Sequence, residues 1–173
     1  MTSAYESLLT RRSVRAYEDR QVPEDLLQKV LAAGLYAPTA RDNQLPMMVV
    51  VQNEETLADL EKLNAEAMTG GKGSPFYGAP TCIVVLSDPE QKNWLQDGSL
   101  VMGNLLNAAH ALGLGACWIN RAMEVFDRPE GKAYLKKWGV PEHYRGVGNC
   151  ILGYAKGDLP QPHARKEGRI KRA

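Results

Sequence analysis

Residues 98–120, which read GSLVMGNLLNAAHALGLGACWIN, contain no Asp, Glu, Lys or Arg. The stretch has about the length of a membrane-spanning helix, which needs roughly 20 apolar residues. However, Gly113 and Gly115 interrupt it, no basic cluster flanks either end, and it contains three polar side chains, Asn104, Asn107 and His110. These features argue against a membrane span. They favour a helix over residues 100–112 that is buried on all sides in a globular protein, with His110 as a satisfied core histidine.

Short apolar runs predict four buried strands. One follows directly after the glycines that end the helix. The four runs span residues 47–51, 81–86, 116–119 and 150–154. Runs of this length, bounded by turn residues, are typical of strands buried in a sheet.

Amphipathic helices alternate with these strands. An apolar stripe begins after Pro23 and ends before Pro38, and this pattern predicts a helix. The same spacing predicts helices over residues 5–9, 57–63 and 133–138. Residues 37–46 and 69–75 are rich in loop formers, and we expect the second loop to be mobile. The pattern predicts one domain over residues 1–173, an α/β or α+β sandwich of two or three layers whose strand order it does not fix.

Composition excludes several classes of function. The chain has 173 residues, with 21 basic and 20 acidic side chains, so no strong field favours nucleic acid or a membrane as a partner. The three cysteines form no Cys-x-x-Cys pair, and the three histidines have no metal-ligand spacing. We therefore expect reduced core thiols and no metal site. Without a basic start followed by an apolar stretch, we expect no secretory signal and a cytoplasmic location.

Arg11, Arg12, Ser13 and Arg15 place three cations and a hydroxyl within five residues. Guanidinium groups match phosphate oxygens, so this run is a candidate phosphate site. Composition alone leaves open the alternative that the run is a solvated helix end. The glycine-rich stretches 70–74 and 113–115 do not have the spacing of ATP or dinucleotide loops, and no Gly-x-Ser-x-Gly elbow supports a hydrolase.

Several pieces, taken in order, resemble the nitroreductase family. They are RRSVR at 11–15, APTA at 37–40 with Gln44, FYGAP at 76–80, DGS at 97–99, AAHALGLG at 108–115 with CWI at 117–119, and LGY at 152–154 before a basic tail. Together they span nearly the whole chain.

The resemblance implies an α+β fold, a three-layer sandwich in which two subunits intertwine as a homodimer and build two FMN sites at their interface. The uncharged helix would then lie at that interface. The FMN phosphate and ribityl chain would be held by Arg11, Arg12, Ser13 and Arg15, joined by Arg165 and Lys166 from the tail.

The flavin ring would be lined by residues of both subunits. The other subunit would supply Pro38, Thr39, Ala40 and Gln44. Trp118, Ile119, Asn120 and Arg121 would lie near the reactive face. A backbone N–H there would donate to the flavin N5 and stabilise the reduced state.

The chain departs from the family's pattern in three places. Asp42 stands where Asn is frequent, and Leu45-Pro46 replaces a frequent Pro-Trp. An acidic Asp42 would either lower the reduction potential of the flavin or simply face water. The compact stretch 62–76 leaves little room for the helical excursion of longer members, so substrate preference is not transferable.

The reaction implied is transfer of hydride from NADH or NADPH to the flavin, followed by reduction of a nitroaromatic or quinone in the same pocket. No catalytic side chain is required, because the cofactor carries the chemistry, and ping-pong kinetics follow. Two alternatives remain: an FMN protein of the same fold with other chemistry, such as reductive dehalogenation or flavin consumption, and a flavin-binding protein without turnover.

Overall fold

The computed structural model describes residues 4–173 as an antiparallel sheet between two layers of helices. The elements in order are α1 (Ala4–Thr10), α2 (Glu24–Leu35), a 3-10 turn η1 (Ala40–Asp42), β1 (Met47–Val51), α3 (Glu54–Thr69), β2 (Thr81–Ser87), α4 (Trp94–Ala111), β3 (Gly115–Ile119), α5 (Ala122–Phe126), α6 (Pro129–Lys137) and β4 (Arg145–Gly153). The sheet has the order β1-β2-β4-β3, and each neighbouring pair is antiparallel.

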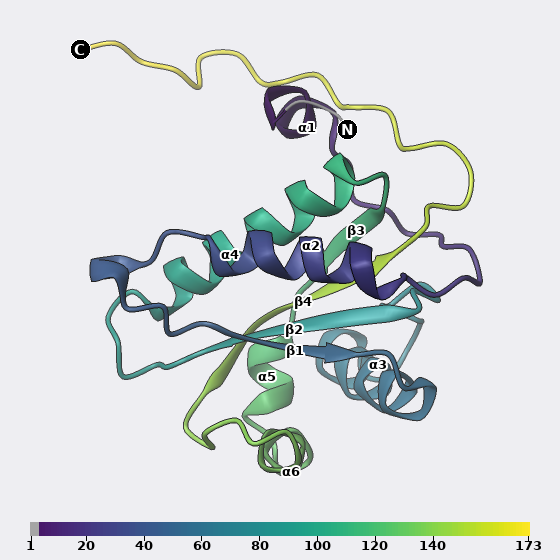
Figure 1. Ribbon diagram of the computed structural model, residues 1–173, viewed down its shortest axis with the longest axis vertical. Coiled ribbons are helices and arrows are strands. Elements are labelled where there is room, and N and C mark those ends of the chain that lie inside the picture. Colours follow the sequence, from purple (N-terminus) through teal and green to yellow (C-terminus); the bar gives the residue numbers. More distant parts are fainter. Residues whose placement is uncertain (1–3) are drawn as a thin grey trace.

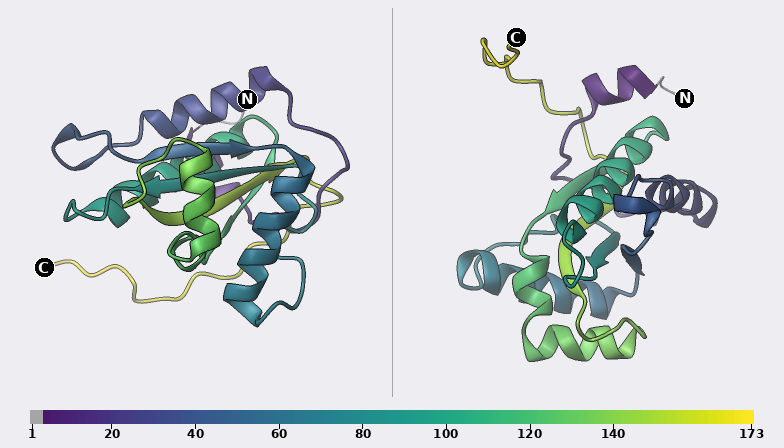
Figure 2. Two further views of the ribbon diagram at one scale, coloured as in Figure 1. Left: turned by 90° about the horizontal axis from the view of Figure 1, so that it is seen from below. Right: turned by 90° about the vertical axis from the view of Figure 1, so that its left-hand side faces the viewer.

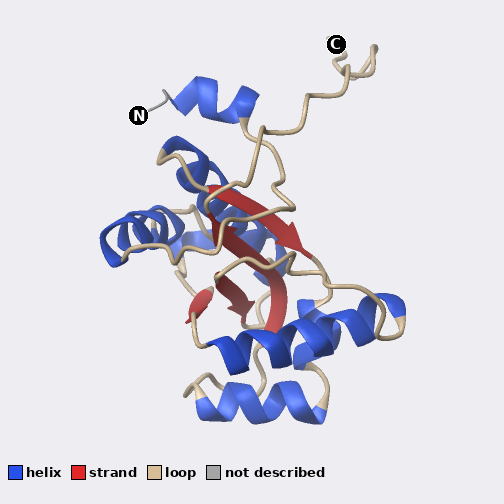
Figure 3. Ribbon diagram, turned by 90° about the vertical axis from the view of Figure 1, so that its right-hand side faces the viewer, coloured by secondary structure: helices blue, strands red, loops and turns tan. Residues whose placement is uncertain are grey.

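Helices cover both faces of the sheet (Figure 1). α2 and α4 lie on one face, and α3, α5 and α6 lie on the other; the views in Figures 2 and 3 show the same layers. The side chains of β2 alternate accordingly: Cys82, Val84 and Leu86 belong to the core under α3, α5 and α6, whereas Ile83 and Val85 pack toward α2 and α4. This alternation is the period-two pattern of a strand buried on both faces. The α+β class and the three-layer sandwich are confirmed.

The predicted strands are present, with two differences in detail. β1 is an edge strand and is only partly buried, with Met47 39% exposed, so the expectation of a fully buried strand there was wrong. β4 begins at Arg145, five residues before the predicted start, because glycines at 146 and 148 hide the strand pattern. Gly146 is needed for packing: a Cβ at this position would lie 2.3 Å from the carbonyl carbon of Ala122.

The central helix α4 differs from its predicted environment. It begins at Trp94 and buries one side against the sheet, while Leu100 on another side is 47% exposed. A single chain therefore does not bury this helix on all sides. Within residues 4–173, no helix is both long and apolar enough to cross a membrane.

The loop after α3, predicted to be mobile, makes several hydrogen bonds to its own helix. Gly70 ends the helix in the left-handed conformation, and the Lys72 backbone N–H donates to the Thr69 hydroxyl at 3.0 Å. The Ser74 hydroxyl and the Phe76 backbone N–H both donate to the Glu61 carboxylate, at 2.6 and 2.7 Å. These bonds hold the loop against its own helix.

Candidate functional site

The arginine segment extends the sheet beyond β3. After α1 the chain runs alongside this edge strand, where Ser13 forms a parallel bridge with Ala116. The Val14 backbone N–H donates to the Ala116 carbonyl at 3.1 Å, and the Val14 side chain is buried. The segment is therefore anchored by its backbone and by one apolar side chain, while Ser13 is half-buried and Arg15 is exposed.

Two guanidinium atoms in this segment are buried without a partner. Arg12 donates from Nη1 to the carbonyls of Leu9 and Arg11, at 3.0 and 2.7 Å, and so caps the end of α1. Its Nε, and Nη1 of Arg11, are shielded from water and make no hydrogen bond with any described residue. Buried charged donors without acceptors are costly. An anionic oxygen that reached either atom would supply the acceptor it lacks.

His110 links the arginine segment to the end of α4. The Thr10 hydroxyl donates to the Glu6 carbonyl at 2.6 Å, so its oxygen accepts from Nε2 of His110 at 2.9 Å. This pattern assigns the neutral tautomer with the proton on Nε2. Burial, followed by the charges of Arg11 and Arg12, lowers the pKa of His110 below its ordinary value. The residue is half-buried at the helix surface, so the expectation of a core histidine was wrong, although its ring nitrogen is satisfied.

Beyond Ala116 the edge of β3 has open backbone groups. Ala116 turns its carbonyl toward the arginine segment, and the period-two alternation of a strand turns the N–H group of Trp118 the same way. Trp118 is half-buried, and its indole lies over Gly148, where a Cβ would come within 2.4 Å of Nε1. The intervening Ile119 points into the opposite core. This edge presents a backbone N–H donor beside a flat aromatic side chain.

The chain turns sharply after β3, at Arg121. This residue has φ +78°, a left-handed conformation that is uncommon for residues other than glycine. Its backbone N–H donates to the Asn120 side-chain oxygen at 2.9 Å, and its guanidinium pairs with Glu124 at 2.8 Å. Helix α5 follows at once, packed against Gly146. Strained, well-supported turns of this kind often occur at functional sites.

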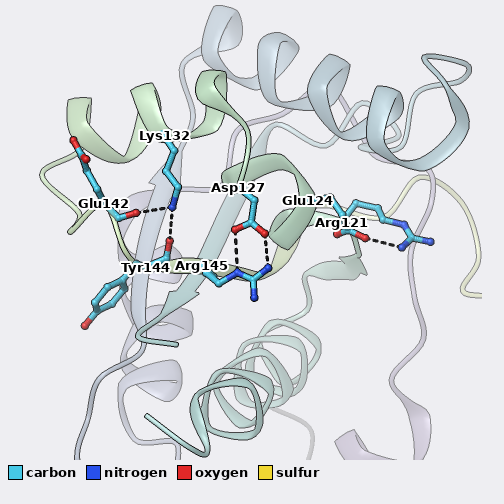
Figure 4. Close-up of polar contacts among 7 residues, drawn as sticks. All are labelled: Arg121, Glu124, Asp127, Lys132, Glu142, Tyr144 and Arg145. Carbon is cyan, nitrogen blue, oxygen red and sulfur yellow. Dashed lines mark hydrogen bonds and ion pairs between the residues drawn. The ribbon is translucent and has the colours of Figure 1, made fainter. Parts of the chain in front are cut away.

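Ion pairs and backbone contacts hold α5 and α6 to the start of β4 (Figure 4). Both oxygens of Asp127 accept from Arg145, which also lowers the pKa of this carboxyl group. Lys132 of α6 donates to the carbonyls of Glu142 and Tyr144. These contacts hold α5 in place, and α5 is the helix that follows the turn at Arg121.

A second candidate segment, residues 38–44, lies at the other end of α4. Its backbone is strained at three positions, Arg41, Asp42 and Gln44, whose φ angles are 57°, 55° and 52°. The Gln44 backbone N–H donates to the Thr39 hydroxyl at 3.0 Å, and the Gln44 side chain donates to the Asp42 carboxylate at 3.0 Å. The loop lines a cavity of about 580 Å³ together with Tyr36, Pro38, Pro46, Met48 and Val101.

Asp97, to which the sequence alone assigned no role, fastens this loop to α4. It is 5% exposed in the first turn of the helix, and its Oδ1 accepts from the Ala40 backbone N–H at 3.0 Å. A carboxylate near a helix N-terminus is also favoured by the helix dipole. The available signal was an acidic residue at the start of an otherwise uncharged stretch.

The predicted site residues thus form separate groups within one chain. Arg11, Arg12 and Ser13 meet the β3 edge near His110, whereas Pro38, Thr39, Ala40 and Gln44 gather near Asp97. Asp97 and His110 are thirteen helical steps apart, which amounts to about 20 Å, and Figure 1 shows the two segments at opposite ends of α4. Arg165 and Lys166 lie on the exposed C-terminal tail, which runs out beyond α1.

The remaining features concern metals and thiols. Among residues 4–173, no three His, Cys, Asp or Glu side chains are grouped closely enough to hold a metal ion. Cys82, Cys117 and Cys150 are free and buried, as predicted. Burial raises the pKa of Cys150 to about 12, so this thiol is not a reactive nucleophile.

Comparisons with known proteins match the chain along most of its length. The profile of the nitroreductase family matches residues 8–154. A Methanothermobacter thermautotrophicus protein, provisionally named NADH dehydrogenase/NAD(P)H nitroreductase, is 37% identical over 153 residues, which cover 86% of this chain and 75% of the relative.

Solved structures agree in fold. A Bacteroides fragilis nitroreductase with bound FMN superposes with a TM-score of 0.90 at 32% identity, and the match covers 100% of both chains. A Desulfitobacterium hafniense nitroreductase with bound FMN gives a TM-score of 0.89 at 26% identity, covering 100% of this chain and 99% of the other.

Proposed function

This chain belongs to the nitroreductase family, and we propose that it is an FMN-dependent oxidoreductase that passes electrons from NADH or NADPH to an electron-poor acceptor. Nitroaromatics and quinones are the acceptor classes to test. The names of the relatives support the nicotinamide donor, and the FMN in similar structures supports the cofactor. We further propose that each chain forms one flavin-binding domain and acts in the cytoplasm, where its three free thiols stay reduced.

The observation that carries the proposal is the pair of buried, unpartnered guanidinium atoms in Arg11 and Arg12. Both arginines directly precede Ser13, on a segment whose backbone is fixed to β3. A terminal phosphate supplies the acceptor oxygens that these donors lack, and guanidinium–phosphate contacts are among the stronger hydrogen bonds in proteins. These residues therefore fit the phosphate end of FMN, together with Arg15, Arg165 and Lys166.

A second copy of the chain would complete the site. The loop at residues 38–44 is about 20 Å along α4 from the arginine segment, so a single chain does not bring both against one flavin ring. A single chain also leaves large apolar side chains exposed. Leu8 and Leu9 of the seven-residue helix α1 are 62% and 56% exposed, and Leu100 of α4 is 47% exposed. A short helix with an exposed apolar face has little stability alone in water. We therefore propose a homodimer with α4 at the interface.

Bound FMN would accept hydride from the nicotinamide and pass electrons to the acceptor. The chain contributes binding and orientation. A backbone N–H within residues 118–121 would face the flavin N5 and stabilise charge that develops there. The loop residues Thr39 and Gln44 of the second copy would line the ring. No side-chain acid or base is needed.

The proposal is tested first on the purified protein by its visible spectrum before and after addition of FMN. Anaerobic addition of NADH or NADPH should then bleach the flavin absorbance. Steady-state rates with a quinone or nitroaromatic should give parallel double-reciprocal lines, because donor and acceptor use the site in turn. Intersecting lines would exclude ping-pong exchange. Bound FMN that neither nicotinamide bleaches would favour other flavin chemistry or a binding protein without turnover.

A further inference from the structure

Helix α3 carries one fully buried amide side chain, Asn64. Its exposed fraction is 0%, and its neighbours on the buried face of the helix are Leu60 and Ala65. Nδ2 donates to the Asn120 carbonyl at 2.8 Å, across 56 residues of sequence. Oδ1 is buried without a hydrogen-bond partner among the described residues.

This contact fixes the peptide group that joins β3 to the turn. A peptide is planar, so holding the Asn120 carbonyl also sets the direction of the Arg121 N–H. That N–H is in turn held by the Asn120 side chain at 2.9 Å, and Arg121 is left-handed. With both ends of the peptide held, the backbone at Asn120 has little freedom to rotate.

Stability alone does not explain an asparagine at this position. A buried amide with an unpaired oxygen is unfavourable, and an apolar side chain of similar size would remove that cost. The Asn120 carbonyl meets this donor on its buried side, although the residue as a whole is exposed. The side chain therefore leaves one polar atom unpaired and holds one particular backbone group in place.

We infer that Asn64 is a positioning residue of the flavin site, which acts through the Asn120 carbonyl to hold the Asn120–Arg121 peptide, and with it the turn that follows β3, in place beside the flavin. The inference rests on the proposed function, since it concerns the same edge of β3. Asn64 itself touches neither flavin nor substrate. Its effect is on how strongly the site prefers reduced over oxidised FMN.

The experiment compares Asn64→Leu with the wild-type holoenzyme. Leucine fills the same space and removes the donor, which lets the turn at Asn120 rotate. We expect the preference for reduced over oxidised FMN to fall about tenfold, the scale of one lost hydrogen bond. For a two-electron couple this is a shift of about 30 mV to a more negative midpoint potential. The potential is measured by anaerobic dye equilibration, and the affinity for oxidised FMN by fluorescence titration.

Asn53→Ala is the matched control on the same helix. Asn53 caps α3 by accepting from the Thr56 backbone N–H at 2.9 Å, so its loss weakens the helix without removing the contact to Asn120. Asn64→Ala is a second variant, in case leucine does not fit the site. A negative shift in either Asn64 variant, absent from Asn53→Ala, supports the inference.

Unchanged potentials in both Asn64 variants, or an equal shift in Asn53→Ala, would overturn the inference and leave the proposed function intact. A wild-type protein that takes up no FMN would overturn the proposed function and the inference with it.

Discussion

The two ends of helix α4 carry candidate binding segments of opposite character. At the His110 end, Arg11 and Arg12 bring charge on an extended backbone that is fixed to the sheet. At the Asp97 end, the loop at residues 38–44 brings little net charge and three left-handed residues. Charge that meets a phosphate binds both redox states of a flavin alike, whereas a shaped loop near the ring can distinguish them. We therefore expect the first end to set affinity and the second to set geometry and potential.

Arg11→Ala tests the affinity end and should have the largest effect. Arg11 has a buried, unpartnered guanidinium nitrogen, and loss of a charged hydrogen bond to phosphate is worth about 1.5–3 kcal/mol. FMN affinity should fall about tenfold to a hundredfold, as measured by fluorescence titration. Arg165→Ala should also lower FMN affinity. Riboflavin, which has no phosphate, should bind the wild type and Arg11→Ala equally. Unchanged FMN affinity in both variants would remove the phosphate assignment.

Mixed dimers test whether the two ends serve one site. A chain with Arg11→Ala is combined with a chain in which Asp97→Ala releases the loop, and the heterodimer is purified by two tags. If each site takes its arginines from one chain and its loop from the other, one site in the mixed dimer is intact and the other doubly impaired. About half of the sites should then combine wild-type FMN affinity with the wild-type midpoint potential. If each chain builds its own site, no site combines the two, because one chain lacks the arginine and the other lacks the anchored loop.

Asp97→Ala on its own tests the anchor of the loop. The Asp97 carboxylate accepts from the Ala40 backbone N–H at 3.0 Å while 5% exposed. We expect a loss of about 1–2 kcal/mol in the free energy of unfolding, from the hydrogen bond and the helix dipole together. Asp97→Asn keeps an acceptor oxygen and should lose less, as measured by urea unfolding. Equal losses in the two variants would mean that the charge matters and the loop contact does not.

The sequence predicts those parts of the fold that carry a local signal and misses those that depend on packing between distant segments. Charge and apolar periodicity are local signals, so the arginine run and the strand β2 are readable directly from the sequence. The helix α5, only five residues long, has no such period. The early start of β4 is hidden by Gly146, which is there because Ala122 packs against its backbone.

The candidate site is likewise predictable in its side-chain chemistry but not in its long-range contacts. The sequence indicates which residues could bind a phosphate, because the chemistry belongs to the side chains themselves. It does not indicate that Asp97 holds Ala40, or that Asn64 holds Asn120, since each bond joins residues more than 50 positions apart. Nor does it show that α4 separates the two groups; that separation depends on the packing of α1 and the loop at opposite ends of one helix.

Asp42→Asn tests whether the loop end sets the potential. The Asp42 side chain accepts from the Gln44 amide at 3.0 Å, and asparagine keeps an acceptor oxygen and tolerates the left-handed backbone. If the carboxylate faces the flavin of the second copy, its removal should raise the midpoint potential. For a partly exposed charge we expect about 1 kcal/mol or less, which is roughly 20 mV for two electrons. An unchanged potential with normal FMN affinity would place Asp42 toward water.

The smallest expected effect is a pH dependence of stability at the arginine end. Burial, and then Arg11 and Arg12, lower the pKa of His110 below its ordinary value of 6.5. As the pH falls, the imidazole of residue 110 is therefore protonated in the unfolded chain before it is protonated in the folded chain. The contribution of His110 to the free energy of unfolding is complete above pH 6.5 and is lost as the pH falls below it. His110→Gln should show a shallower loss of unfolding free energy between pH 7.5 and 5.5, measured with urea. The difference should shrink when FMN is bound, because its phosphate offsets the arginine charges that lower the pKa. Parallel curves for the two proteins would show that folding does not lower the pKa of His110, and an undiminished difference with FMN would mean that burial, rather than the arginine charges, sets the shift.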